Sequence, residues 1–241
     1  MFCLALGLLF GFAPILATLG LPGVALVQLL LIAAPAVVFA RLIGGSGREA
    51  LRLLGVRKAK PSAIIGGLLI GASFWYINLL VVIPLFEERI RRAHDIQHIE
   101  QLAEASPIVW TLITLAVLPA LCEELLMRGV VARGLRPALG LVGAIVVSAL
   151  LFGVFHLSFA RLVPTALLGA ALAYATLMTG SIVPSCVAHL INNAVVLLIG
   201  LGAAPRVIVS ALENYVVPSA VLALTATISG FWLIWRARDS S

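Results

Sequence analysis

Charged residues are scarce in this sequence. Asp, Glu, Lys and Arg make up 11% of its 241 residues, against about 25% in an ordinary soluble domain. Ten acidic residues are too few to cover a soluble surface of this size. Apolar types make up 62% and form several runs near or above the roughly 20 residues that cross a bilayer core. The composition excludes a water-soluble fold and predicts that most of the surface faces lipid.

Cysteine is scarce as well. The three cysteines, Cys3, Cys122 and Cys186, lie in apolar stretches and form no CxxC pair. This pattern excludes a disulfide framework and a cysteine zinc site, so we expect small core residues. The net charge of +6 comes without clustered base-reading or stacking groups, so the sequence predicts no nucleic-acid partner.

Prolines and charges divide the chain into eight apolar ranges, which are 2–19, 22–42, 62–86, 107–127, 138–157, 162–179, 182–200 and 208–235. They are too long and too continuously apolar to be strands. We therefore predict an all-α, polytopic membrane protein with about eight transmembrane helices in one bundle. Within a single domain, 1–241, we expect an N-terminal hairpin with a basic interfacial segment (1–60), a third span with an outer loop (61–106), core helices (107–200), and a last span with a short tail (201–241).

Lysine and arginine predict the orientation, because cytoplasmic loops are enriched in them. The segment 41–60 holds six basic residues, and with eight spans the basic residues of 133–136 and 236–238 fall on the same side. The count favours both termini in the cytoplasm, by ten to five. We expect Met1–Leu19 to be a retained first helix, since it lacks a basic start, and we expect the protein in a prokaryotic plasma membrane. The sequence specifies no oligomeric state.

Two adjacent carboxylates and an arginine interrupt the apolar range 107–127 at its end. Glu124 and Arg128 are four residues apart and can pair as a salt bridge on one helix face. Glu123 points roughly 100° away. An ionisable group inside a span is costly, so the unpaired Glu123 is a candidate for chemistry.

Histidine and asparagine interrupt two further apolar ranges. His156 closes the run that contains Phe152, and His189 lies four residues before Asn193 on one helix face. Each alone is as readily a structural hydrogen-bonding group. Together, two carboxylates, two histidines and an asparagine are the parts needed to activate a water and stabilise an oxyanion.

These three motifs, EExxxRG, FxxxH and HxxxN in this order, resemble those of the CPBP family of membrane proteases, over about residues 107–200. That family includes the type II CAAX prenyl endopeptidases. The resemblance implies an intramembrane endopeptidase that hydrolyses a peptide bond in a membrane-associated protein or peptide. It implies that Glu123 is the base and His156 its partner, that His189 and Asn193 hold the oxyanion, and that Glu124 and Arg128 brace the helix. Phe152 is expected to support this site.

The resemblance leaves a metal open. Glu123, His156 and His189 would make an acceptable catalytic zinc set with a water as fourth ligand, although the HExxH spacing is absent. A glutamate-activated water needs no cofactor, and this metal-free mechanism is the preferred hypothesis. A non-catalytic scaffold or immunity-type protein of the same fold, and a proton-coupled transporter, are the alternatives.

Two other motifs are weaker. Glu87–Arg92 repeats EExxxR in a polar loop where water solvates charge cheaply. His94 and His98 resemble a zinc-protease pair but have Asp95 between them and no third ligand nearby. We expect the loop 87–106 to be an exposed connector that covers the cavity.

Helix rise tests whether the site can assemble. If the chain turns near Pro137, Glu123 lies roughly 20 Å from the turn and His156 roughly 30 Å. Convergence on one water therefore requires the helix 138–157 to tilt, or the chain to turn later than Pro137.

Overall fold

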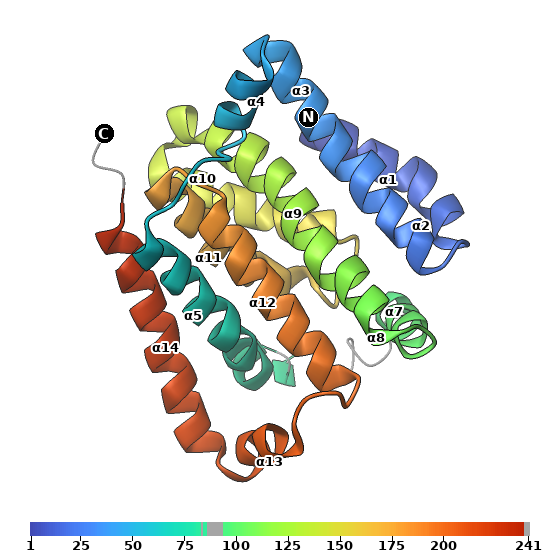
Figure 1. Cartoon of the computed structure of the whole chain (residues 1–241), viewed down its shortest axis with the longest axis vertical. Helices are drawn as coiled ribbons and strands as arrows, with labels where there is room; N and C mark the ends of the chain where they lie inside the picture. Colours follow the sequence, from blue (N-terminus) through green and yellow to red (C-terminus); the bar gives the residue numbers. More distant parts are fainter. Residues whose placement is uncertain (83, 86–93, 239–241) are drawn as a thin grey trace.

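The fold is a bundle of helices (Figure 1). The computed structural model describes residues 1–82, 84–85 and 94–238. The helices are α1 (Phe2–Ala17), α2 (Leu21–Leu26), α3 (Ala34–Gly44), α4 (Gly47–Leu53), α5 (Pro61–Ile77), α7 (His94–Glu104), α8 (Ile108–Leu112), α9 (Leu118–Glu124), α10 (Arg133–Phe155), α11 (Leu162–Thr179), α12 (Val183–Gly200), α13 (Arg206–Asn214) and α14 (Val216–Arg236). The described residues also include four π-helical segments, each of which continues the helix before it: Val27–Ala33, Asn78–Val82, Ile113–Val117 and Leu125–Ala132. The described residues contain no strand, so the predicted all-α class is confirmed.

Six continuous helical stretches in the described part of the chain are long and apolar enough to cross a membrane. They are Leu21–Gly44, Pro61–Val82, Ile108–Phe155, Leu162–Thr179, Val183–Gly200 and Val216–Arg236, and the shorter Phe2–Ala13 is also apolar. The stretch Ile108–Phe155 holds two of the predicted spans, because Gly140 breaks it with a φ of 67°. The protein is thus an integral, multi-pass membrane protein.

The predicted start of the last span is wrong. The range 208–235 is divided at Tyr215 into the separate helices α13 and α14. Pro218 lies in the first turn of α14, where its missing N–H costs least. Helix α14 therefore begins only at Val216, and α13 contains no buried residue.

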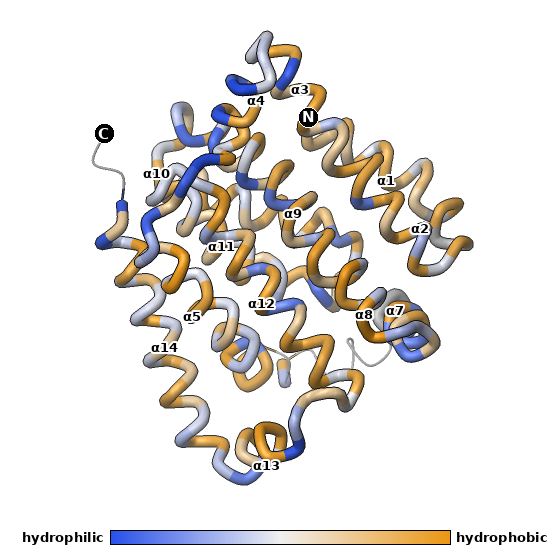
Figure 2. The backbone as a smooth tube through the Cα atoms, in the orientation of Figure 1, coloured by the Kyte–Doolittle hydropathy of each residue, from blue (hydrophilic) through white to orange (hydrophobic). Residues whose placement is uncertain are grey.

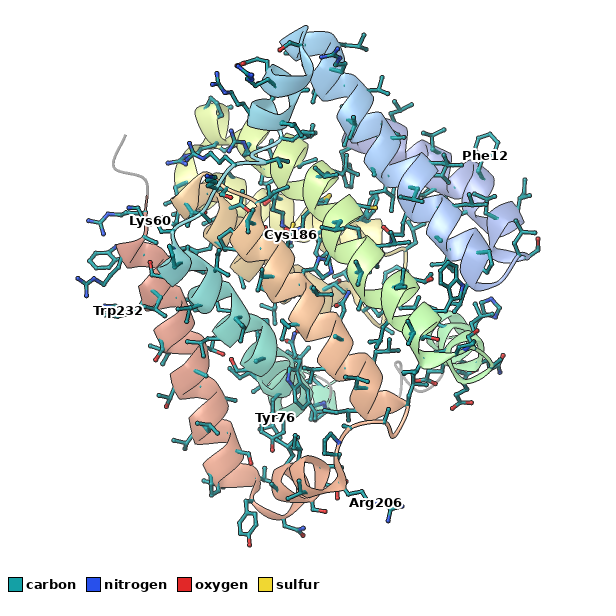
Figure 3. All side chains as sticks on the ribbon, viewed as in Figure 1. Phe12, Lys60, Tyr76, Cys186, Arg206 and Trp232 are labelled. Atoms are coloured by element: carbon teal, nitrogen blue, oxygen red, sulfur yellow. The ribbon has the colours of Figure 1, made fainter. Side chains whose placement is uncertain are left out.

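The basic residues predicted to share one side lie at one end of the bundle. Figure 2 shows hydrophilic segments gathered near α4, the start of α5 and the C-terminus. Arg57 and Arg133 both bind the turn after α11, donating to the carbonyls of Thr179 and Gly180 at 3.0 and 2.7 Å. Lys60 lies at this end, and Arg206 lies at the other end (Figure 3).

Small residues bring α5 close to the helix that carries two predicted site residues. A Cβ at Gly67 or Gly71 would collide with the backbone carbonyl of Pro184 or Ala188 on α12. Backbones approach this closely in membranes only where side chains are small. The contact fixes α12 immediately before His189.

Candidate active site

Glu123 and Glu124 end helix α9 in the interior of the bundle, with exposed fractions of 6% and 0%. Glu124 Oε1 lies 3.2 Å from Arg128 Nη1, so the predicted ion pair is present. The Arg128 guanidinium also donates to the Gly169 carbonyl at 3.2 Å and lies 4.3 Å from the centre of the Phe152 ring. Arg128 therefore ties α9 to α10 and α11 while it neutralises Glu124.

His189 lies between the two carboxylates. Its Nδ1 donates to Glu124 Oε1 at 3.0 Å, and its Nε2 lies 4.0 Å from Glu123 Oε2. A histidine ring that is 2% exposed and held by one carboxylate has a fixed orientation. Helix α12 thus supplies a second partner for Glu124 and presents Nε2 to Glu123.

His156 follows the last residue of α10 and is fixed from its own helix. Its Nδ1 donates to the Phe152 carbonyl at 2.9 Å, which leaves Nε2 for the surroundings. The Phe152 ring meets both imidazoles edge-on, with centroids 4.8 Å from His156 and 5.8 Å from His189. Phe152, which is fully buried, is the packing element that the two histidines share.

One cavity of about 890 Å³ joins these residues. Its polar lining includes all four residues predicted to be catalytic, which are Glu123, His156, His189 and Asn193. The apolar part of its wall includes residues of α1, the π-helical segment 27–33 and α7, together with residues of α10, α11 and α12. The four predicted catalytic residues therefore face one cavity, whose apolar walls suit an apolar peptide segment.

The turn at Gly140 explains how His156 reaches the depth of Glu123. The predicted turn at Pro137 is wrong, because Pro137 lies inside a helix and the positive φ occurs three residues later. Measured from Gly140, both Glu123 and His156 lie roughly 25 Å away along their helices. The later turn therefore removes the 10 Å mismatch in depth that a turn at Pro137 would produce.

Sequence reasoning missed several polar residues that line this cavity, and two of them contact predicted site residues. Gln28 Nε2 donates to Glu123 Oε1 at 2.9 Å from the N-terminal hairpin. Asn192 lines the cavity and donates to Asn193 Oδ1 at 3.3 Å. Both had a signal, since each is a polar amide in an apolar span.

The two weaker sequence motifs, Glu87–Arg92 and the pair His94 and His98, add little to the candidate site. Glu87–Arg92 lies outside the described residues. His98, on α7, is exposed and lines the cavity together with Ile99 and Leu102, so the described part of the predicted loop 87–106 borders the cavity.

The candidate metal ligands do not form a ligand set. Among the described residues, no three His, Cys, Asp or Glu side chains are grouped so that they could hold a metal ion. The two ring nitrogens of His189 face the two carboxylates, and Nδ1 of His156 is bound to a backbone carbonyl.

A known family matches the part of the chain that carries most of these residues. Residues 104–195, which include both glutamates, Arg128, Phe152, both histidines and Asn193, match the family model described as type II CAAX prenyl endopeptidase Rce1-like. This stretch of the chain is thus similar to the CPBP-type CAAX proteases. The matched segment covers less than half of the chain and leaves the N-terminal hairpin and α14 outside the match. Searches among curated proteins and among solved structures gave no match.

Proposed function

We propose that this protein is an intramembrane endopeptidase that hydrolyses a peptide bond in a membrane-associated protein or peptide. One observation carries the proposal. Glu124 is held by Arg128 and His189, whereas Glu123 Oε2 is buried beside the cavity and has no hydrogen-bond partner among the described residues. Adjacent carboxylates in such different surroundings suit different roles, one structural and one chemical.

Glu123 acts as the general base in this mechanism. Its Oε2 takes a proton from a water as the water oxygen attacks the scissile carbonyl carbon. His156 Nε2, on the same cavity, orients that water. When the tetrahedral intermediate collapses, Glu123 returns the proton to the departing amine and the C–N bond breaks.

His189 and Asn193 stabilise the oxyanion. His189 donates Nδ1–H to Glu124, which turns Nε2 toward the cavity, where its protonated form presents Nε2–H to the developing negative charge. The Asn193 amide nitrogen is the second donor, because its Oδ1 accepts from Asn192. Such preorganised donors act strongly in a site that excludes water.

Comparison of membrane peptides between cells tests the activity. Cells that carry the wild type are compared with cells that carry Glu123→Gln, and Glu213→Gln on the exposed face of α13 is the matched control. Peptide products that disappear only with Glu123→Gln support the proposal and identify the substrate. Identical peptide sets in all three strains contradict it and favour a non-catalytic scaffold.

A chelator tests the metal-free form of the mechanism. We propose that purified protein cleaves the substrate found above at an unchanged rate after chelation. Loss of cleavage that one added divalent ion restores would contradict this form and leave the peptidase activity intact.

A further inference from the structure

The base is held from a part of the chain that the family match does not include. Gln28 lies on the π-helical segment Val27–Ala33 and is 7% exposed. Its Nε2 donates to Glu123 Oε1 at 2.9 Å across 95 residues of sequence. The matched segment begins at residue 104.

Helix association does not require this hydrogen bond. The N-terminal hairpin already packs on α9 and its π-helical continuation through a buried apolar cluster that includes Leu9, Leu31, Ile32, Cys122 and Leu126. A buried amide costs free energy unless it is hydrogen-bonded, so an apolar residue would serve adhesion better. The amide at this position instead has a role toward the carboxylate.

The two carboxylate oxygens of Glu123 differ in their hydrogen bonding. Oε1 accepts from Gln28, whereas Oε2 has no hydrogen-bond partner among the described residues and lies 4.0 Å from His189 Nε2. A carboxylate is planar, so holding Oε1 sets the rotation of the whole group. Gln28 thereby fixes the direction in which Oε2 faces the cavity that both residues line.

We propose that Gln28 is a positioning residue for the base. It keeps Oε2 of Glu123 aimed at the attacking water, so the N-terminal hairpin completes the active site as well as walling the cavity. The inference rests on the proposed function, and its effect is expected in turnover and not in substrate binding, because Gln28 acts through Glu123.

The test compares two buried hydrogen bonds between helices. Gln28→Met keeps length and bulk but removes the donor. Thr227→Val is the matched control, because it removes the buried 2.7 Å contact between Ser73 and Thr227, neither of which lines the cavity. Full-length variants are purified, and melting temperature, kcat and KM are measured on a synthetic peptide that spans the Glu123-dependent cleavage site.

We expect Gln28→Met to lower kcat by about ten- to a hundredfold with KM within about twofold, since misplacing a catalytic group by about 1 Å costs this much. Thr227→Val should leave kcat unchanged at a similar melting temperature. Equal kcat in the two variants, or equal loss of kcat and melting temperature in both, would overturn the inference.

A second variant keeps the inference testable if Gln28→Met does not fold. Gln28→Asn keeps the polar group but is one methylene too short to reach Glu123, so it should show the same loss of kcat. If neither Gln28 variant folds, its role is structural and the inference is wrong. If Glu123→Gln is active, the proposed function fails, and that outcome is distinct from full activity of Gln28→Met beside an inactive Glu123→Gln.

Discussion

Glu123 and Glu124 are adjacent in the sequence, but their surroundings differ because different side chains contact them. The pairing of Glu124 with Arg128 follows from spacing within one helix, so the sequence predicts it. The contacts of Glu123 come from Gln28 and His189 on other spans, and no local spacing specifies them. The sequence therefore distinguishes the two roles but does not supply the partner that holds the base.

Removal of Arg128 should destabilise the protein. Arg128→Ala leaves Glu124 as a buried charge without its arginine partner, and breaking such a pair costs about 3–5 kcal/mol. The matched control is Arg52→Ala, which breaks the exposed 3.4 Å contact with Glu49 and should cost less than about 1 kcal/mol. Melting temperature and yield of purified protein measure both. Equal yields would show that the buried pair is not required for folding.

Alanine variants of His156 and His189 should differ in whether they lose turnover alone or both turnover and thermal stability. His156 makes one hydrogen bond to its own helix and an edge contact with Phe152, so His156→Ala should lower turnover by about 10²–10⁴-fold with little change in melting temperature. His189→Ala should lower both, because it removes a buried partner of Glu124. Cleavage assays and thermal melts of the same preparations compare them. A large drop in melting temperature for His156→Ala would assign it a structural role.

The positions of the helices in this fold depend on helix breaks and on close backbone contacts as well as on the length of the apolar ranges. The helical character of the ranges was predictable from composition, whereas the place of the turn between the fourth and fifth ranges was not. Pro137 removes one backbone donor but keeps a helical φ, so the helix runs through it. Gly140 reverses the chain because its φ of 67° is open to glycine.

Substitution at this turn should be costly although there is space for a side chain. A Cβ at Gly140 meets nothing within 4 Å, so the obstacle is the backbone conformation, worth about 1–3 kcal/mol for a residue other than glycine. Gly134→Ala on the same helix also meets nothing within 4 Å but has no positive φ, so it should be neutral or stabilising. Thermal melts of Gly140→Ala and Gly134→Ala provide the comparison. Equal melting temperatures would contradict a turn fixed by backbone conformation.

At the scale of the whole molecule, at least four regions of the chain meet at one cavity, and only one of them is the matched segment. The N-terminal hairpin supplies Gln28 and much of the apolar wall, and α7 borders the space. Hydropathy predicts that these regions are helical but carries no information on which spans are neighbours. The gathering of the basic residues at one end of the bundle was predictable, because the positions of Lys and Arg between the apolar ranges are known from the sequence.

The orientation in the membrane is a further prediction. Lys60 and Arg206 are exposed and lie at opposite ends of the bundle (Figure 3). In intact cells, a membrane-impermeant maleimide should label Arg206→Cys and spare Lys60→Cys, in a background where the exposed Cys3 is replaced by serine. The reverse pattern would show that the basic end faces outward and that the predicted orientation is wrong.

The most direct test of the central claim is the cleavage rate of purified Glu123→Gln protein on the substrate identified in cells. Glutamine keeps the shape of the side chain and can still contact Gln28, but it cannot take a proton from water. We predict that the rate falls by at least about 10²–10⁴-fold while the melting temperature stays within a few degrees of the wild type. A rate within tenfold of the wild type would contradict the assignment of Glu123 as the base.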